Sequence, residues 1–388
     1  MNSRRPKRAV AGRIAVAGHV CLDIIPELYA SGTRIAPGKL VVVGPATVST
    51  GGAVPNTGIA LHRLGLPVTL LGKVGDDLFG RAVLARLRSH GRALADGMIV
   101  ARGENTSYTV VLSPPGADRT FLHSPGANDT FRAADVPASR LAGAALLHFG
   151  YPPLMRRMRS DGGRELRELL GRARRAGLTT SLDMAMPDPR SEAGRLDWPR
   201  LLARVLPRVD FFLPSLEEIR FMLGDRSGRS ADGALLGRLS GRLLGMGAAA
   251  VGIKLGADGL YLRTTADRSR LADCGRAAPD ALRWAGRELL APCFRVRVAG
   301  TTGSGDCTIA GFLAGLVKGL GPEETLTAAV ATGACCVESA DATGGIIPWT
   351  RLARRIRAGW PRLPVGLSLP GWKWQARRAV WTGPADRS

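Results

Sequence analysis

Short apolar and β-branched runs alternate along this chain with longer segments of helical periodicity, and this alternation limits the fold more than any other feature. Because buried strands need helices to cover them, the pattern predicts an α/β fold with a sheet that carries helices on both faces. The buried central strands are predicted at residues 14–17, 69–71, 146–149, 179–183, 211–214 and 249–254. The helices between them are predicted at residues 57–64, 79–90, 163–176, 217–223 and 232–244.

Three segments depart from this alternation. Residues 35–50 and 105–123 are typical of exposed strands joined by turns such as Pro114-Pro115-Gly116. Residues 264–292 form a long connection rich in Arg and Ala, and whether it is functional or loosely ordered stays open. No internal repeat occurs, and 45% apolar residues can fill one large core, so we expect a single domain.

A glycine-rich turn at residues 300–306 runs directly into an apolar segment that extends to Leu316. Gly303 and Gly305 allow backbone angles closed to other residues, so successive N–H groups can converge on a phosphate at the start of a helix. Asp306 then stands within reach of a hydroxyl brought to that phosphate. The alternative interpretation is a glycine-rich loop with an Asp that caps a buried helix.

A second motif favours the first interpretation. Residues 51–65 place paired glycines and Asn56 before an amphipathic helix, and residues 72–80 follow with Gly-Lys-Val-Gly-Asp-Asp-Leu-Phe-Gly. In this order the motifs resemble the signature regions of the ribokinase-like (PfkB) family of carbohydrate and nucleoside kinases. The resemblance runs from about Arg13 to Trp349.

The resemblance implies a ribokinase-like three-layer α/β/α sandwich with a mostly parallel central sheet and a small β-strand lid. It places the kinase domain at residues 13–350, with lid strands at about 35–50 and 105–123. A basic arm at residues 1–12 precedes the domain, and a basic, Trp-containing extension at 351–388 follows it. The implied reaction is ATP-dependent phosphorylation of a hydroxyl of a small sugar or sugar derivative, with ATP and Mg²⁺ as cofactors.

The matching residues then receive roles from the family. Asp306 would be the general base that takes the proton of the attacking hydroxyl. The backbone of residues 302–305 would form the anion hole for the transferring phosphate, which adds Gly303, Ser304 and Gly305 to the catalytic set.

The nucleotide side is implied by weaker matches, which are Lys254, Gly256, Gly259 and Thr302. A β-hairpin turn explains Gly256 and Gly259 equally well. Glu218 would reach Mg²⁺ through water, although Ser215 stands where the family usually has Asn. Gly300 replaces an Asp that helps many relatives to hold a monovalent cation, so we expect weak or absent activation by K⁺.

The sugar side is implied by Asp23, Gly51, Gly52 and Asn56. Asp23 is expected at the end of the opening strand, where its carboxylate could accept two hydroxyl protons, but an Asp at a strand end is common without any function. Asp76 would assist the same site or cap the helix that begins near Phe79.

The choice of substrate stays open at this stage. Lid side chains would select the sugar, and the candidates are Tyr108, Phe121, His123 and Asn128, with Arg119 as the partner of a sugar acid. A nucleoside kinase of the same family is the nearest alternative, and it would need an apolar slot for a base.

The net charge of +22 suggests nucleic-acid binding, but its distribution argues against nucleic acid as a partner. Residues 1–13 carry five basic and no acidic side chains, and residues 351–388 carry nine basic and one acidic. Many other Arg residues occupy helix faces, as solvated charges do. Trp372, Trp374 and Trp381 interleave with the terminal Arg residues, so a non-catalytic, nucleic-acid-binding protein of this fold is the alternative from another class.

Six cysteines form no CxxC pair and no metal-like spacing with the five His, as in a protein of the reducing cytoplasm. No secretory leader is visible, and the longest apolar run, residues 307–317, falls well short of the roughly 20 that cross a bilayer, so we expect no membrane partner. The apolar run at residues 40–43 is compatible with a homodimer that pairs through the lid.

Overall fold

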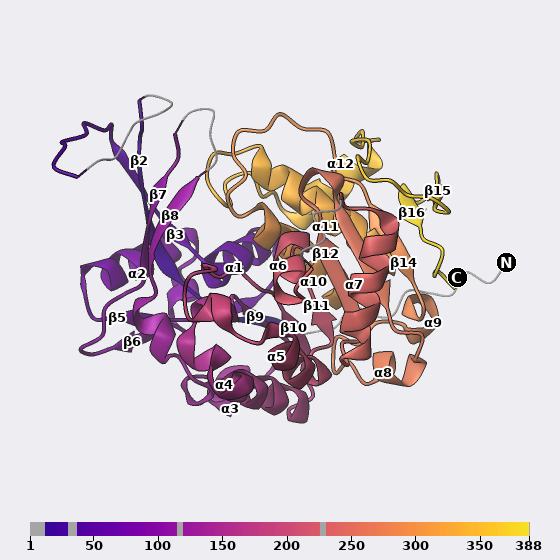
Figure 1. Ribbon diagram of the computed structural model, residues 1–388, viewed down its shortest axis with the longest axis horizontal. Helices are drawn as coiled ribbons and strands as arrows, with labels where there is room; N and C mark the ends of the chain where they lie inside the picture. The colour runs from indigo at the N-terminus through magenta and orange to yellow at the C-terminus, as the bar shows by residue number, and fades with distance from the viewer. Residues whose placement is uncertain (1–11, 30–36, 115–118, 226–229, 388) are drawn as a thin grey trace.

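The computed structural model describes residues 12–29, 37–114, 119–225 and 230–387, and it is built around one ten-stranded sheet (Figure 1). Six neighbouring strands run parallel, in the order β4 (Val68–Leu71), β1 (Arg13–Gly18), β9 (Ala144–Gly150), β10 (Thr179–Leu182), β11 (Phe211–Phe212) and β12 (Ala250–Lys254). The sheet continues antiparallel through β13 (Leu260–Thr264), β14 (Glu288–Ala291), β16 (Val380–Thr382) and β15 (Lys373–Gln375). The predicted α/β class and mostly parallel sheet are confirmed.

Helices cover both faces of this sheet because its buried strands alternate their side chains. In β1, Ile14 and Val16 pack on one side, and Ala15 and Ala17 pack on the other. The first side is covered by α1 (Ala53–Arg63), α2 (Leu78–His90), α10 (Ser304–Val317), α11 (Pro322–Val337) and α12 (Trp349–Arg357). The second is covered by α3 (Ala138–Leu141), α4 (Arg156–Arg175), α5 (Trp198–Val205), α6 (Leu216–Met222) and α7 (Gly233–Gly245).

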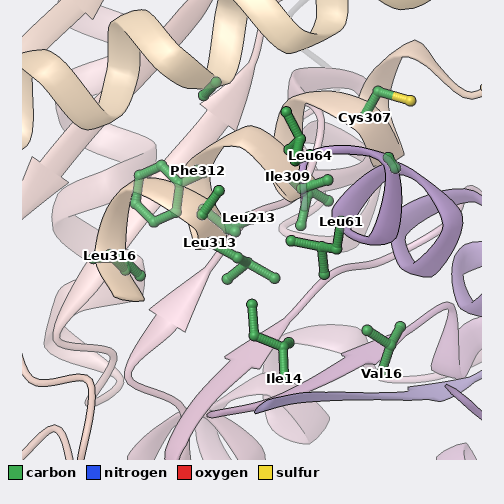
Figure 2. Close-up of a cluster of buried hydrophobic side chains, with 14 of the residues drawn as sticks. Ile14, Val16, Leu61, Leu64, Leu213, Cys307, Ile309, Phe312, Leu313 and Leu316 are labelled. Carbon is green, nitrogen blue, oxygen red and sulfur yellow. The ribbon is translucent and has the colours of Figure 1, made fainter. Parts of the chain in front are cut away.

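The core under α1 and α10 fixes the part of the fold that matters for the site. Figure 2 shows Ile14 and Val16 of β1 beneath side chains of both helices, which are Leu61, Leu64, Ile309, Phe312, Leu313 and Leu316. These side chains are at most 3% exposed. At about 25 cal/mol per Å² of buried apolar area, such a cluster holds both helices firmly against the sheet.

A four-stranded sheet stands away from the body as the predicted lid (Figure 1). Its order is β3 (Ala46–Gly51), β2 (Cys21–Pro26), β7 (Tyr108–Leu112) and β8 (Thr120–Ser124). The strand predicted from residue 35 begins only at Ala46, and Leu40 and Val42 lie exposed outside any strand. Residues 1–11, 35, 36 and 115–118 of the predicted arm and lid, which include two residues of the predicted Pro114-Pro115-Gly116 turn, lie outside the described part of the chain.

Two further segments are more ordered than their sequence suggested. The long connection at residues 264–292 contains α8 (Arg268–Ala272) and α9 (Ala281–Trp284), and Trp284 is fully buried. From the predicted C-terminal extension, β15 and β16 pair with β14 and lengthen the main sheet. A separate pair, β5 (Lys73–Gly75) and β6 (Ile99–Ala101), completes the strands.

The C-terminal residues are held by a buried ion network. The Arg287 guanidinium lies 2.8 Å from a Glu323 carboxylate oxygen and 3.0 Å from one of Asp386. All three side chains are at most 5% exposed, and Arg378 also contacts Glu323. Because Glu323 lies in the first turn of α11, the network joins that helix to the end of the chain.

We expect Arg287→Ala to lower the free energy of unfolding by about 3 kcal/mol or more, because it removes the guanidinium that two buried carboxylates share. The matched control is Arg283→Ala, which removes a half-exposed ion pair with Glu324 and should cost less than about 1 kcal/mol. Urea unfolding of both variants is the measurement. Equal losses would show that the buried network does not anchor the C-terminal residues.

Candidate active site

The first turn of α10 contains the predicted anion hole at the start of a buried helix. Gly303 precedes the helix at φ 74°, and a Cβ atom there would lie 2.7 Å from the Cβ of Ala342, so the turn requires glycine. The helix begins at Ser304 with no side-chain cap, and the Ser304 N–H donates to the Thr301 carbonyl oxygen at 3.3 Å. The positive end of the helix at this turn favours an anion. The predicted anion hole therefore lies at a helix start.

The Asp306 side chain points from this turn into a junction of three elements. The Asn56 amide of α1 donates to Oδ2 at 2.9 Å, and the Tyr151 hydroxyl, which follows β9, lies 2.9 Å from both carboxylate oxygens. Asp306 is 2% exposed. Burial raises the pKa of Asp306, while Asn56, Lys254 and Tyr151 oppose that rise.

A cavity of about 270 Å³ opens on one side of this helix start. It is lined by five residues predicted for the nucleotide and the anion hole, which are Lys254, Gly256, Gly259, Ser304 and Gly305. Gly259 has φ 106°, and a Cβ there would lie 2.0 Å from the Ala291 carbonyl oxygen. Gly259 is therefore required by the hairpin turn as well as being placed at the cavity.

Sequence reasoning missed Asp183, which immediately follows β10. Its carboxylate accepts a hydrogen bond from the Lys254 ammonium at 2.7 Å, and its other oxygen is buried with no hydrogen-bond partner among the described residues. Burial opposes the charged form of Lys254, but Asp183, Glu218 and Asp306 outweigh it and raise the Lys254 pKa. The sequence feature that could have identified Asp183 was its position at the carboxyl end of a predicted buried strand.

Glu218 lies in the first turn of α6 and forms a capping box with Ser215. The Ser215 N–H donates to Glu218 Oε2 at 2.7 Å, and the Glu218 N–H donates to Ser215 Oγ at 3.3 Å. Glu218 also lines the second cavity described below. Within the described chain, no group of three or more His, Cys, Asp or Glu side chains forms a metal site.

The second cavity, of about 650 Å³, lies between the lid and the body. Asp23, Gly52, Phe121, His123 and Tyr151 contribute to its walls. The prediction that Asp23 ends the opening strand was wrong, because β1 stops at Gly18 and Asp23 lies within the lid strand β2. Burial raises the Asp23 pKa to about 6, against hydrogen bonds from Cys21 and Thr109.

The paired glycines make room for polar groups of this cavity. A Cβ at Gly51 would lie 2.2 Å from a carboxylate oxygen of Asp23 on the neighbouring strand. A Cβ at Gly52, which has φ 96° and precedes α1, would lie 2.6 Å from His19 Nδ1. At both positions glycine leaves room for the neighbouring Asp23 or His19 side chain, which a larger residue would displace.

The lid candidates divide into two groups. His123 and Phe121 line the cavity, and His123 Nε2 lies 3.4 Å from Nε2 of His19, another residue that sequence reasoning missed. Tyr108 packs on Phe79 instead, with ring centroids 5.4 Å apart. Asn128 is fully buried and bonds both backbone groups of Val20, so it holds the chain rather than facing a ligand.

Arg119 connects the lid to the helix start. Its guanidinium donates to the Thr302 hydroxyl and to the Thr301 hydroxyl, the latter at 3.3 Å. Thr302 was predicted to bind the nucleotide, and in the structure its side chain contacts the lid residue Arg119. The lid and the glycine-rich turn are in direct contact, although they are far apart in the sequence.

Two smaller predictions have separate outcomes. Asp77, not Asp76, caps α2, because its carboxylate accepts from the Gly80 N–H at 2.7 Å; Asp76 is exposed. At Gly300, a Cβ would lie 3.0 Å from the Ala340 carbonyl oxygen, so even a small side chain would fit tightly. The weak response to K⁺ stays a prediction.

One cavity therefore borders the start of α10 at Ser304 and Gly305, and the other is lined by Tyr151, which bonds Asp306. The model of the pfkB family carbohydrate kinases matches residues 11–349. The chain belongs to the pfkB family of carbohydrate kinases. As a member it is an ATP-dependent phosphotransferase that acts on a sugar.

Two relatives align along most of their length. An uncharacterized sugar kinase of Archaeoglobus fulgidus is 25% identical over 74% of this chain and 98% of its own length. The 2-dehydro-3-deoxygluconokinase of Bacillus subtilis is 25% identical over 83% of this chain and 90% of its own. Fructokinase-1 of Zea mays is 32% identical, but over 36% of this chain and 42% of its own length.

Solved structures confirm the fold of this kinase. The ribokinase of Arabidopsis thaliana, solved with ribose and ATP, has a TM-score of 0.69 at 17% identity and covers 89% of this chain and 98% of its own. The ribokinase-like three-layer sandwich is therefore confirmed. Among the described residues, no helix is both long and apolar enough to span a membrane.

Gly51→Ala tests whether the space beside Asp23 serves the sugar. The added Cβ would displace the Asp23 carboxylate, so we expect the KM for the sugar to rise about tenfold, as for the loss of a hydrogen bond to a charged group. Gly245→Ala is the matched control, since nothing lies within 4 Å of a Cβ there. Steady-state kinetics is the measurement, and an unchanged KM in Gly51→Ala would remove Asp23 from the sugar site.

Proposed function

We propose that this kinase transfers the γ-phosphate of ATP to a hydroxyl of a small sugar or sugar derivative, with Asp306 as the general base. The observation that carries the proposal is the place of Asp306. Its helix start borders the cavity of about 270 Å³, and its partner Tyr151 lines the cavity of about 650 Å³. Nucleotide and sugar in these two cavities would meet at one carboxylate.

The reaction follows from this arrangement. Asp306 accepts the proton of the sugar hydroxyl as that oxygen bonds to the γ-phosphorus and the bond between the phosphorus and the β–γ bridging oxygen breaks. The backbone of residues 302–305, at the positive end of α10, would stabilise the charge that develops on the transferring phosphate. Lys254, whose raised pKa keeps it cationic, lies beside Gly305 and would hold the nucleotide phosphates.

The residues present fit Mg²⁺ brought in with the nucleotide. Such ions keep several waters and bind through substrate phosphates plus one or two carboxylates. Glu218, through water, and Asp183, one of whose oxygens accepts no hydrogen bond from the described residues, would hold it; the charges of both act on Lys254. When bound, Mg²⁺ would neutralise charge on the phosphates.

The acceptor side favours a polyol. Asp23, His19 and His123 give the larger cavity carboxylate and imidazole groups that suit hydroxyls. One relative whose name specifies its substrate, the 2-dehydro-3-deoxygluconokinase of Bacillus subtilis, aligns along 90% of its own length. A nucleoside is the second candidate acceptor, because Phe121, Leu154 and Met186 form an apolar part of the wall of the larger cavity, where a base could bind.

The nucleic-acid alternative is weakened by the packing of Trp372, which is 8% exposed and has its ring 6.0 Å from that of Tyr261. This ring is not free to stack on bases. Trp374 is 42% exposed, with its ring 5.5 Å from that of Trp381. A homodimer through the lid stays part of the proposal, because Leu40 and Phe121 are 93% and 55% exposed there.

Asp306→Asn tests the base directly. In ADP-release assays with ATP, Mg²⁺ and a panel of sugars, sugar acids and nucleosides, we expect turnover to fall by about 10² or more. Asp232→Asn is the matched control, because Asp232 caps α7 and Asn caps equally well. Equal turnover in wild type and Asp306→Asn would contradict the role of the base.

The pH dependence tests Asp23. Its carboxyl, with a pKa of about 6, accepts hydroxyl protons fully only when ionised, so we expect the KM for the sugar to rise as pH falls below about 6. Asp23→Asn should raise the KM at pH 8 about tenfold and abolish this dependence. A variant that keeps the wild-type KM profile would show that Asp23 does not bind the sugar.

A further inference from the structure

Tyr151 adopts a backbone conformation that its residue type disfavours. It has φ 65° and ψ 42°, in the left-handed region, where a residue with a large side chain is rare. The following residue is Pro152, which pushes its predecessor towards extended angles and away from helical ones. Such strain persists when surrounding contacts impose it, and it concentrates at functional sites.

The contacts of Tyr151 show what the strain achieves. The residue follows β9 directly, and its hydroxyl lies 2.9 Å from Oδ1 and 2.9 Å from Oδ2 of Asp306. Its ring lies 6.0 Å from that of His19, within the wall of the larger cavity. The phenol therefore stands between the carboxylate and the proposed sugar site.

The hydroxyl acts as a donor throughout the ordinary pH range. Burial raises the Tyr151 pKa, and the charges of Asp306 and Asp183 raise it further. The phenol therefore stays protonated, and the two Asp306 oxygens accept its hydrogen bond.

We propose that Tyr151 is a positioning residue for Asp306: its hydroxyl donates to the buried carboxylate, keeps it ionised and aims it at the sugar hydroxyl. The inference rests on the proposed role of Asp306 as base. A carboxylate has about four acceptor sites, so Tyr151 and the sugar hydroxyl can bind it together.

The other groups around Asp306 do not replace this donor. Asn56 of α1 donates to Oδ2, whereas Tyr151 also reaches Oδ1. Lys254 of β12 favours the ionised form but donates to Asp183. Glu218 of α6 carries the same charge as Asp306 and opposes ionisation. Loss of the phenol would therefore leave a buried carboxylate with less support for its charge.

The test is Tyr151→Phe, which removes the hydroxyl and keeps the ring. Tyr261→Phe is the matched control, because the Tyr261 hydroxyl also donates to a buried carboxylate, that of Glu288, at 2.8 Å and away from this site. We expect Tyr151→Phe to lower kcat about tenfold with little change in the KM for ATP. The acidic limb of its kcat profile should move to higher pH by about one unit, because a donor to the ionised form is lost. Tyr261→Phe should change neither.

A direct titration separates this inference from the proposed function. In protein labelled with ¹³C at the aspartate carboxyl carbons, the Asp306 signal is assigned by its absence in Asp306→Asn. Tyr151→Phe should raise the Asp306 pKa by about one, with or without turnover. An unchanged pKa overturns the inference, and so does wild-type kcat in a folded Tyr151→Phe protein. Absence of wild-type turnover with every panel member would instead refute the proposed function.

Discussion

The burial of one carboxylate governs this active site. Asp306 is almost fully covered, and burial alone would favour its neutral form, which is useless as a base. The surrounding elements each supply a compensation: the helix start, the Asn56 amide, the Tyr151 phenol and the charge of Lys254. A carboxylate kept ionised in a dry site is a stronger base than one in water. The burial that disfavours the charge of Asp306 therefore also makes the ionised group a better base.

The fold is arranged to make this compensation possible. The shared core on β1 holds α1 beside α10 (Figure 2). As a result, Asn56 and Asp306 meet although 250 positions separate them. The lid adds Asp23, His123 and the Arg119 contact to Thr302 from the other side. At the far edge of the sheet, β15, β16 and the buried ions around Arg287 make the C-terminal residues part of the same body (Figure 1). Deleting them to test the basic terminus would therefore remove strands as well as charge.

The alternation of buried strands and helices was enough to predict a sheet with helices on both faces, because period and length are local properties of the sequence. That the sheet is mostly parallel was implied by the resemblance to the ribokinase-like family. The glycines at 51, 52 and 303 were found because their spacing is unusual, and the structure gives each a steric reason. The places of Asp23 in β2 and of Asn128 against Val20 were not predictable, since they depend on which strands pair. Tyr151 and Asp183 were missed for a related reason: each follows a strand, and only the assembled sheet brings them to Asp306 and Lys254.

The central claim is that the two cavities deliver nucleotide and sugar to Asp306. A crystal structure with Mg²⁺, a non-hydrolysable ATP analogue and the sugar that supports turnover tests it most directly. The account predicts a γ-phosphate on the N–H groups of residues 302–305 and a sugar hydroxyl oxygen about 3 Å from an Asp306 oxygen. A phosphate bound elsewhere, or a sugar whose hydroxyls lie beyond the reach of Asp306, would contradict it.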